Sequence, residues 1–583
     1  MKQVPLLATL VILAVFATAQ TIQPIDKIKL EKKLDSLFRF FNNKNSPGYA
    51  ITVLQNGKPV AKKDYGMASL EFKIPFTHNT VITLPYSEGR EFISIAAVLM
   101  EEEGKLKLED KVRKYFPQLP AWSDAVTIQD LLNHSSGFCD EWATLALTQA
   151  SMNNRLDVSQ FLNFLYRQPD PQVEPGKGYM YCNSDFGLLR LILDKVSGEP
   201  LPVYLKRKVF TPLKMYATSM QVRKDDMIPD HAFSYISDGD NGYRPHLRNK
   251  TSPGGNYWML TSANDLEKWT AIHADGNSFI SKAISRLKQH ARPIPVLKGT
   301  SYVFGHKINR MGNYEVISHK GVSGYAYVTR IPSATISVIC VSSYWQPYEE
   351  KIDELAKWLL QVKDEKQSDV KKFPSTAIAL SKEELQQFTG YYRVQNALTF
   401  QSTVEKKSYK EFKLVGDSLS WVYTSDDIFA VMPVGKGIFK DPGFPVWLIY
   451  DQPHPDSVMT LEIHSQFEGN VDVEYLRKDT AARPQYSKES LQKITGRYYS
   501  PHLDFYWTIM LDDEGKLVLK RPTIADKYLE PGPDGEFMLK VQYYEDDEST
   551  NWIRFYYNAA GEVTHFNIWH PRLMHHRFDK VAN

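Results

Sequence analysis

The sequence predicts an α+β protein: an antiparallel sheet flanked by helices and interrupted by an all-helical insertion, followed by two small β-rich modules. Strand patterns stand at both ends of the first part, "YAITVLQNGKPVAKKDYG" near its start and "YEVISHKGVSGYAYVTRI" and "ATISVICVSS" near its end. A mostly helical stretch lies between them, from about Ser87 to Lys214. The last third is rich in aromatic residues that alternate with polar ones, which is typical of strands.

The first and last strand patterns most simply form one sheet, with the first and last helices packed on it. The amphipathic stretch "DKIKLEKKLDSLFRFF" predicts the first helix, and Asn56-Gly57 predicts a tight turn in the hairpin after it. A turn at Pro332-Ser333 joins the late strands. The closing helix is marked by apolar residues at helical spacing: Ile352, Leu355, Leu359 and Val362.

Length, amino-acid composition and net charge narrow the classes to which this protein can belong. A chain of 583 residues is too long for one core and indicates roughly two to four domains. Hydrophobic content of 43% and charged content of 24% are those of a globular protein. The net charge of +2 and the lack of a long Lys/Arg run argue against dedicated nucleic-acid binding.

Residues 1–19 have the pattern of a cleavable signal peptide. Lys2 precedes an apolar core from Leu6 to Phe16, and Ala17-Thr18-Ala19 is a small-residue cleavage site. The apolar run is too short to span a bilayer well. We therefore expect a secreted or periplasmic protein with no membrane span after cleavage. Gln20 in place of cysteine after the cut predicts no lipid anchor.

An internal repeat divides the rest of the chain. "LSKEELQQFTGYYRV" from Leu380 resembles "YSKESLQKITGRYYS" from Tyr486, and each is followed later by a hairpin pattern. The predicted division is a signal peptide (1–19), a first domain (20–363), a linker (364–379), module 1 (380–480) and module 2 (486–583). The modules are expected to be antiparallel sheets or barrels with aromatic interiors. A structural cap beside the first domain is favoured over independent ligand binding.

The chain has three cysteines: Cys139, Cys182 and Cys340. They are too few for a disulfide framework, and an odd number cannot all be paired within one chain. Three free thiols are the simpler interpretation, although a secreted chain could pair two of them. Cys340 lies in an apolar run that predicts a buried strand. No Cys/His spacing indicates zinc.

A candidate nucleophile precedes the first helix of the insertion. The apolar face of that helix is formed by Phe92, Ile95, Ala96, Leu99 and Met100, and Gly104 should end the helix. Ser87 precedes it, where a helix N-terminus favours developing negative charge. Three residues on stands Arg90, which stays protonated and cannot accept the serine proton.

Taken together, several stretches resemble the serine β-lactamase and penicillin-binding-protein family, in its branch of class C enzymes, D-amino-acid peptidases and esterases. The resemblance covers roughly Ile25 to Leu360. It is carried by "AAVLMEEEGKLKLEDKV", "TIQDLLNHSSGF", "YCNSDFGLLRLILDKVSG", "SPGGNYWMLTSANDLEKW" and "HKGVSGY" in this order. The family also implies the tail, because many secreted members carry one or two lipocalin-like modules.

The resemblance assigns roles to individual residues. Ser87 matches the acylated serine of Ser-x-x-Lys. Tyr181 and Asn183 match Tyr-x-Asn, with the tyrosine as base and then acid. His319 opens a His-x-Gly motif that ends at Gly321 and, like Gly255, is expected to contact substrate. The implied oxyanion hole is formed by the backbone N–H groups of Ser87 and Val322.

Arg90 is the departure, because it stands where the family has lysine. If lysine is the only base, the site is dead or slowed by orders of magnitude. If Tyr181 is the base, the role of the cation is electrostatic. Gly89 leaves room for the larger guanidinium, and Glu88 could pair with it and hold it away. Two hypotheses follow. The first is a serine hydrolase that needs neither a metal nor a cofactor and cleaves peptide amides or esters, for example those of D-amino acids or cell-wall fragments. The second is a pseudoenzyme that binds such ligands without turnover.

The same residues could also have purely structural roles. Ser87 could be only a helix cap, Tyr181 and Asn183 packing and turn residues, and His319 structural. Ser285-Arg286-Leu287-Lys288 matches Ser-x-x-Lys by letter, but it lies in a basic, surface-like stretch far from the other motifs and is treated as a chance match. The sequence does not determine the oligomeric state.

Overall fold

A computed structural model gives the fold and describes most of the chain from residue 24 to residue 582. The described ranges are 24–84, 89–148, 157–221, 226–238, 242–246, 258–273, 278–290, 294–297, 300–320, 325–345, 349–362, 373–395, 409–422, 428–442, 446–452, 454, 456–467, 470–479, 486–520, 526–532, 535–544, 547–570 and 572–582. The predicted signal peptide and much of the predicted linker lie outside these ranges.

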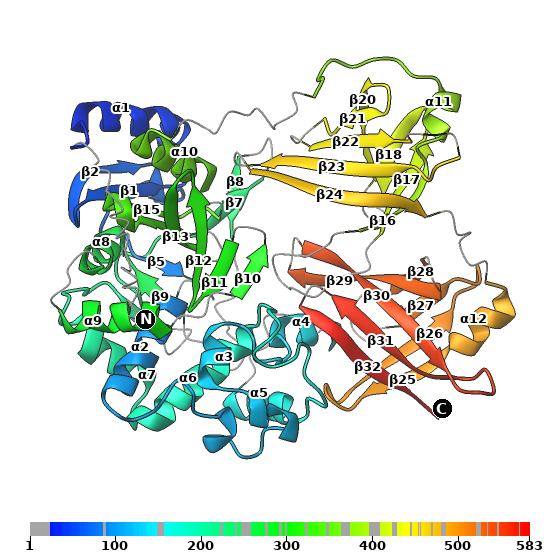
Figure 1. Ribbon diagram of the computed structural model, residues 1–583, viewed down its shortest axis with the longest axis horizontal. Helices are drawn as coiled ribbons and strands as arrows, with labels where there is room; N and C mark the ends of the chain where they lie inside the picture. Colours follow the sequence, from blue (N-terminus) through cyan, green and yellow to red (C-terminus); the bar gives the residue numbers. More distant parts are fainter. Residues whose placement is uncertain are drawn as a thin grey trace, which may run out of the picture.

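The first domain is built on one antiparallel sheet of eight strands (Figure 1). The early hairpin pairs with the last strand of the domain, so that Ile51 lies opposite Cys340. Asn56 and Gly57 both have positive φ, as a two-residue hairpin turn requires. In sheet order the strands are β10 (Ile294–Leu297), β11 (Thr300–Val303), β12 (His306–Met311), β13 (Tyr314–Lys320), β14 (Ala326–Ile331), β15 (Ile336–Ser342), β1 (Tyr49–Gln55) and β2 (Lys58–Tyr65).

Helices cover both faces of this sheet because alternate residues of its central strands point to opposite sides. Ile51 and Val53 belong to a core with α1 (Lys27–Leu37) and α10 (Glu349–Leu360). Ala50 and Leu54 belong to the core of the other face. That face carries α2 (Arg90–Glu102), α8 (Ala263–Ile272) and α9 (Phe279–His290). The predicted sheet with its first and last helices is confirmed.

The helical part between β5 and β9 supplies the walls of the candidate site. Its further helices are α3 (Ile128–Leu132), α4 (Glu141–Leu145), α5 (Val158–Tyr166), α6 (Asn183–Ser197) and α7 (Leu201–Leu205). Short strands flank them: β3 (Met67–Ser69), β4 (Ile74–Pro75), β5 (Ile82–Leu84), β6 (Ser219–Gln221), β7 (Tyr235–Ser237), β8 (Tyr243–Pro245) and β9 (Trp258–Thr261).

Each tail module begins with the same local structure, as the repeat predicts. A serine caps a short helix, and a strand follows in which a buried tyrosine donates to the carbonyl four residues before it: Tyr392 to Phe388 and Tyr498 to Ile494. Both interiors are aromatic. Figure 1 shows module 1 in yellow and module 2 in orange to red.

The two modules differ in closure. Module 1 is a nine-stranded sheet, and module 2 is a closed barrel of eight strands. Module 1 contains α11 (Lys382–Gln386), β16 (Gly390–Val394), β17 (Tyr409–Val415), β18 (Ser418–Val422), β19 (Ile428–Ala430), β20 (Met432–Gly435), β21 (Ile438–Lys440), β22 (Val446–Asp451), β23 (Thr460–Phe467) and β24 (Asn470–Asp479). Module 2 contains α12 (Lys488–Ile494), β25 (Gly496–Ser500), β26 (Phe505–Leu511), β27 (Leu517–Lys520), β28 (Lys527–Pro531), β29 (Glu536–Tyr544), β30 (Asp547–Tyr557), β31 (Val563–His570) and β32 (Leu573–Val581).

The structure corrects two sequence-based interpretations. The stretch from Tyr314 to Ile331 forms two strands, β13 and β14, and three further strands precede them. The segment around Ser285 is only partly a surface stretch: Ser285, Arg286 and Lys288 are exposed, but the segment belongs to α9, whose Ile284 and Leu287 are buried against the core. Its basic residues alternate with apolar ones at helical spacing, and the composition alone hid that face.

Candidate active site

Three of the predicted site residues come together in the described structure. Arg90 opens α2, Tyr181 lies in the segment before α6, and Asn183 is the first residue of α6. The backbone of His319 lies near the end of β13, paired with Val328. Ser87, Val322, Gly321 and Gly255 lie outside the described residues, as does Glu88.

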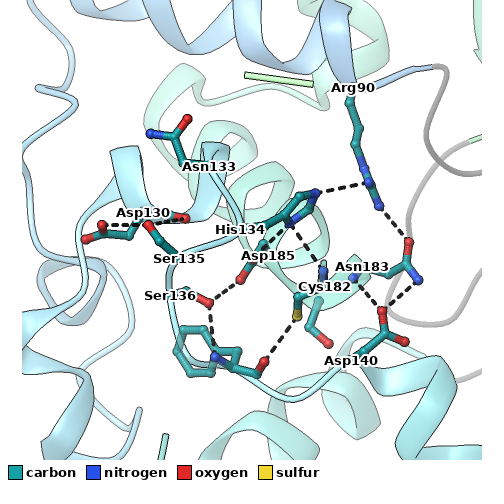
Figure 2. A network of polar contacts seen from close by, with 12 residues as sticks. Arg90, Asp130, Asn133, His134, Ser135, Ser136, Asp140, Cys182, Asn183 and Asp185 are labelled. Carbon is teal, nitrogen blue, oxygen red and sulfur yellow. Dashed lines mark hydrogen bonds and ion pairs between the residues drawn. The ribbon is translucent and has the colours of Figure 1, made fainter. Parts of the chain in front are cut away.

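Arg90 is almost fully buried, with 2% of its surface exposed. Its guanidinium donates through Nη2 to Oδ1 of Asn183 at 2.6 Å and through Nη1 to Nε2 of His134 at 3.1 Å (Figure 2). The Cζ atom lies 4.4 Å from the centre of the Tyr181 ring and 4.8 Å from that of Phe186. The side chain is therefore fixed by polar partners and aromatic faces at once.

The electrostatic surroundings keep Arg90 charged. Burial by itself would lower the pKa of Arg90, but Tyr181 and Tyr302 beside it raise that pKa above its usual value. Arginine is already the side chain least able to lose a proton. Arg90 is therefore a fixed positive charge, and it cannot serve as the base that the family's lysine provides.

Both ends of the Asn183 amide are engaged. Oδ1 accepts from Arg90, while Nδ2 and the backbone N–H both donate to Oδ2 of Asp140 at 2.9 Å. Asp140 also caps α4 by accepting from the backbone of Ala143 at 3.0 Å. This network fixes the start of α6 against the start of α4 and orients the amide toward the arginine.

Sequence reasoning did not single out His134 and Asp185 as site residues. His134 has a left-handed backbone (φ 56°) at the end of α3, and its Nδ1 lies 3.0 Å from Oδ2 of Asp185. Burial, Arg90 and Arg572 lower the pKa of His134 well below its usual value, so the ring is neutral. Arg90 can only donate to Nε2, which assigns the proton of the neutral ring to Nδ1, facing Asp185; the backbone N–H of Cys182 also approaches Nδ1, at the longer distance of 3.4 Å. The motif "LLNHSSGF" contained the histidine and could have indicated it.

Asp185 is a fully buried carboxyl of this network. Burial raises the pKa of Asp185 well above its usual value, although Ser136, which donates to Oδ1, and Arg90 act in the opposite direction. The chain of contacts runs from Ser136 through Asp185 and His134 to Arg90 (Figure 2). Three segments that are distant in sequence, namely α2, the loop after α3 and α6, are thus tied together around one guanidinium.

Tyr181 carries a second guanidinium on its ring, and that group comes from module 2. The Cζ atom of Arg572, which lies between β31 and β32, is 4.7 Å from the ring centre. Its Nη1 lies 3.9 Å from Oδ2 of Asp140, and 8% of the residue is exposed. The Tyr181 hydroxyl is buried and makes no hydrogen bond of normal geometry to a described residue. Module 2 therefore forms part of the wall of the site.

Specific contacts hold module 2 in this position. Nε1 of the buried Trp507 donates to the carbonyl of Leu147 at 2.9 Å, and the backbone N–H of Met574 donates to Oε1 of Gln172 at 2.7 Å. The side chain of Met574 packs in a small cluster with Val173 and Met180, just before Tyr181 in sequence. The predicted role of the tail as a cap beside the first domain is too narrow for module 2, because one of its side chains lies on the candidate base.

Other predicted features can be stated for the described residues alone. All three cysteines are free and buried, with Cys340 in β15 as expected. Within the described ranges, no cluster of three His, Cys, Asp or Glu side chains has an arrangement that could hold a metal ion. No described helix combines the length and the apolar character needed to cross a membrane.

Comparisons with known proteins identify the family. The sequence profile of the family described as "Beta-lactamase" matches residues 20–363. Penicillin-binding protein 4* of Bacillus subtilis (strain 168) is 29% identical over 211 residues, covering 36% of this chain and 46% of that protein. D-aminopeptidase of Brucella anthropi is 25% identical over 280 residues, covering 48% of this chain and 52% of that protein. The chain thus spans about half the length of the curated relatives it matches.

A solved structure shares the overall fold. The octameric penicillin-binding protein homologue from Pyrococcus abyssi aligns with a TM-score of 0.51 at 21% identity, covering 86% of this chain and 99% of that chain. At that identity the likeness concerns the fold alone. The profile match, which covers more than half of the chain, goes further: the chain belongs to the beta-lactamase family of serine hydrolases.

Proposed function

We propose that this protein is a serine hydrolase that cleaves peptide amides or esters through an acyl-enzyme at Ser87. The observation that carries the proposal is the assembly of Arg90, Tyr181 and Asn183 in one buried network. Arg90, the first of these residues, stands three positions after Ser87 in sequence. The relatives named above include a D-aminopeptidase and a penicillin-binding protein. They favour D-amino-acid peptides or cell-wall fragments as substrates.

The proposed reaction has two halves. The Ser87 hydroxyl attacks the substrate carbonyl, and its proton passes to Tyr181 in the phenolate form. The negative oxygen of the tetrahedral intermediate is held by the backbone N–H groups of Ser87 and Val322. Collapse releases the amine or alcohol, which takes the proton from Tyr181. Water then hydrolyses the acyl-serine by the reverse path, with His319 and Gly255 on the substrate side.

Arg90 acts in this scheme as a positive charge and a positioning group. It stacks on the Tyr181 ring and fixes the Asn183 amide, so it stabilises negative charge that develops near the tyrosine hydroxyl. Arg572 adds a second positive charge to the same ring. Tyr181 is the proton carrier in this scheme, since the lysine is replaced.

Covalent labelling tests the proposal. The full-length protein is incubated with a serine-reactive fluorophosphonate and with a fluorescent penicillin, and the adduct is located by mass spectrometry. We expect an adduct on Ser87 that is lost in Ser87→Ala, while Ser136→Ala, a serine in the same network, keeps it. If wild-type protein labels no better than Ser87→Ala, the serine is not a nucleophile.

A second candidate function rests on a different observation. Both ends of the Asn183 amide already have protein partners, and Arg90 cannot accept a proton. A site of this kind would bind peptide or cell-wall fragments without turnover and would hold a ligand carboxylate on an arginine. In that case Arg90→Ala weakens binding of a muropeptide measured by calorimetry and Ser87→Ala leaves it unchanged. Absence of heat for both variants and for wild type counts against this second function.

Secretion is a separate part of the proposal. The pattern of residues 1–19 predicts removal of a signal peptide, and the mature chain should begin at Gln20. Expression with and without these residues, followed by fractionation and N-terminal sequencing, checks the cleavage site. Retention of Met1 in the exported protein would contradict it.

A further inference from the structure

A pocket outside the Arg90 network borders the first turns of α2, where Glu91 and Ile95 line it. It has a volume of about 480 Å³ and is enclosed by α2, α8 and α9 together with the sheet. This volume is within the range of about 300–1,000 Å³ that is typical of small-molecule sites. None of Arg90, Tyr181, Asn183 and Arg572 lines it.

The walls of the pocket are mainly aliphatic. Leu54, Ile95, Ile284, Leu287, Ile308 and Ile336 are among the lining residues. They come from β1, α2, α9, β12 and β15, so the pocket separates the sheet from its covering helices. Apolar walls of this kind favour a ligand with an apolar body.

The deep end of the pocket is polar. Glu91, which follows Arg90 in α2, lies 3.1 Å from Nη2 of Arg330 and 3.2 Å from Nε2 of both His273 and His306. Burial alone would raise the pKa of Glu91, but Arg330 and His306 lower it well below its usual value. One carboxylate is therefore in contact with an arginine and two histidines.

Several buried polar atoms at this end lack a hydrogen-bond partner among the described residues, Oε1 of Glu91 among them. Nε and Nη1 of Arg330 have no hydrogen-bond partner among the described residues, and the same holds for Nε1 of Trp269 and Oγ1 of Thr270. All three residues line the pocket, and each is at most 5% exposed. Buried donors without an acceptor are costly, so their concentration around one pocket indicates an oxygen-bearing occupant.

The other end of the pocket opens to solvent. Lys288, Glu315, Pro332 and Thr335 line it and are exposed. A ligand can therefore enter from this end with its polar head leading toward Arg330. The two exposed charges at the opening are of opposite sign and do not exclude an anion.

We infer that this pocket binds a small monocarboxylate with an apolar body, whose carboxylate accepts from Arg330 while its body lies against α9 and the sheet. The unpartnered Nε and Nη1 of Arg330 select the head group, and the aliphatic walls select the body. The site is independent of the chemistry proposed for Ser87, and it borders the catalytic helix because Glu91 is the neighbour of Arg90.

Calorimetry with a matched pair of probes tests the head group. The full-length protein is titrated with 4-phenylbutanoate and with 4-phenylbutan-1-ol. The carboxylate should bind at least about tenfold more tightly, since a hydrogen bond to a charged group accounts for that ratio. Equal affinity of the two probes overturns the inferred carboxylate recognition. Absence of binding by both means a pocket filled by water, which overturns the site.

Variants locate the binding. Arg330→Gln should weaken 4-phenylbutanoate at least about tenfold, and Leu287→Trp, which fills the pocket, should abolish binding. Arg310→Gln, an exposed arginine on the adjacent part of the sheet, is the matched control and should change nothing. If Arg330→Gln does not fold because Glu91 is left without its ion pair, the double variant Glu91→Gln/Arg330→Gln replaces it.

Hydrogen exchange separates this site from the candidate active site. Bound 4-phenylbutanoate should protect amides of α8 and α9 and should bind equally well to Arg572→Ala. Protection confined to α6, or binding that is lost in Arg572→Ala and kept in Arg330→Gln, places the probe at Tyr181 and overturns the inference.

Discussion

Two arginines lie on the ring of Tyr181 and reach it by different routes. Arg90 comes from the first residue of α2 and is 4.4 Å from the ring centre, whereas Arg572 comes from module 2 and is 4.7 Å from it. Arg90 donates short hydrogen bonds to His134 and Asn183. Nη1 of Arg572 lies 3.9 Å from Oδ2 of Asp140. One guanidinium is fixed by the interior of the first domain, and the other depends on how module 2 docks.

The difference separates two kinds of contribution to one site. Removing Arg90 leaves its two acceptors, on His134 and Asn183, without their donor inside a buried network. Removing Arg572 opens a wall formed by another part of the chain. Loss of Arg90 should therefore act mainly on stability and on the chemistry at Ser87. Loss of Arg572 should act mainly on which substrates the site binds.

The largest effect is expected for Arg90→Ala. Hydrogen bonds to a charged group contribute about 1.5–3 kcal/mol each, so loss of both should lower the free energy of unfolding by at least about 3 kcal/mol. Urea denaturation followed by circular dichroism measures it. Arg286→Ala, an arginine on α9 whose side chain is 43% exposed, is the control and should change stability by less than about 1 kcal/mol. Equal losses would mean that the Arg90 network is not stabilising.

The carboxyl groups behind the two arginines give a pH dependence. Burial, followed by the neighbouring Asp140, raises the pKa of Glu141 from its usual 4.5 to about 8. Because the folded state holds this proton more tightly, its contribution to stability is complete below pH 4.5. The contribution is lost as the pH rises through about 8.

Glu141→Gln removes that titration and keeps a side chain able to contact Ser184. Between pH 5 and pH 9, wild type should lose at least about 1 kcal/mol of stability relative to the variant. Thermal or urea unfolding at both pH values measures the difference. If wild type and Glu141→Gln differ in stability by the same amount at pH 5 and at pH 9, Glu141 is ionised in the folded protein at both pH values.

The smallest effect on stability is expected for Arg572→Ala. A cation–π contact is worth about 0.5–2 kcal/mol, so the loss should stay below that of Arg90→Ala. The phosphonate should still label Ser87, but the ability of different dipeptides to compete with the label should change. Arg577→Ala, an exposed arginine on the following strand, is the control and should change neither. If Arg572→Ala costs as much stability as Arg90→Ala, the two arginines are equivalent and the distinction fails.

The same two arginines show how far sequence reasoning reaches. Arg90 was predicted because a helical face and a motif with fixed spacing locate it, and the main sheet was predicted from alternation and a two-residue turn. Arg572 could not be predicted, because a side chain nearly 400 residues from Tyr181 reaches it only through docking of module 2. His134 was within reach, since its motif was noticed, but its role depends on a left-handed backbone that brings it to Asp185. The buried face of α9 was missed because basic residues dominate its composition.

The most direct test of this site is the labelling rate of Arg90→Lys. Our central claim is that Arg90 is a fixed charge that replaced a proton acceptor while Tyr181 and Asn183 kept their places. Lysine at this position recreates Ser-x-x-Lys with a group that can lose its proton when buried. The variant should acylate Ser87 with a fluorescent penicillin at least about tenfold faster than wild type, within the range expected for a positioned base. The advantage should grow as the pH rises through neutrality. Slower acylation by Arg90→Lys than by wild type would contradict the claim and make the arginine an adapted catalytic group.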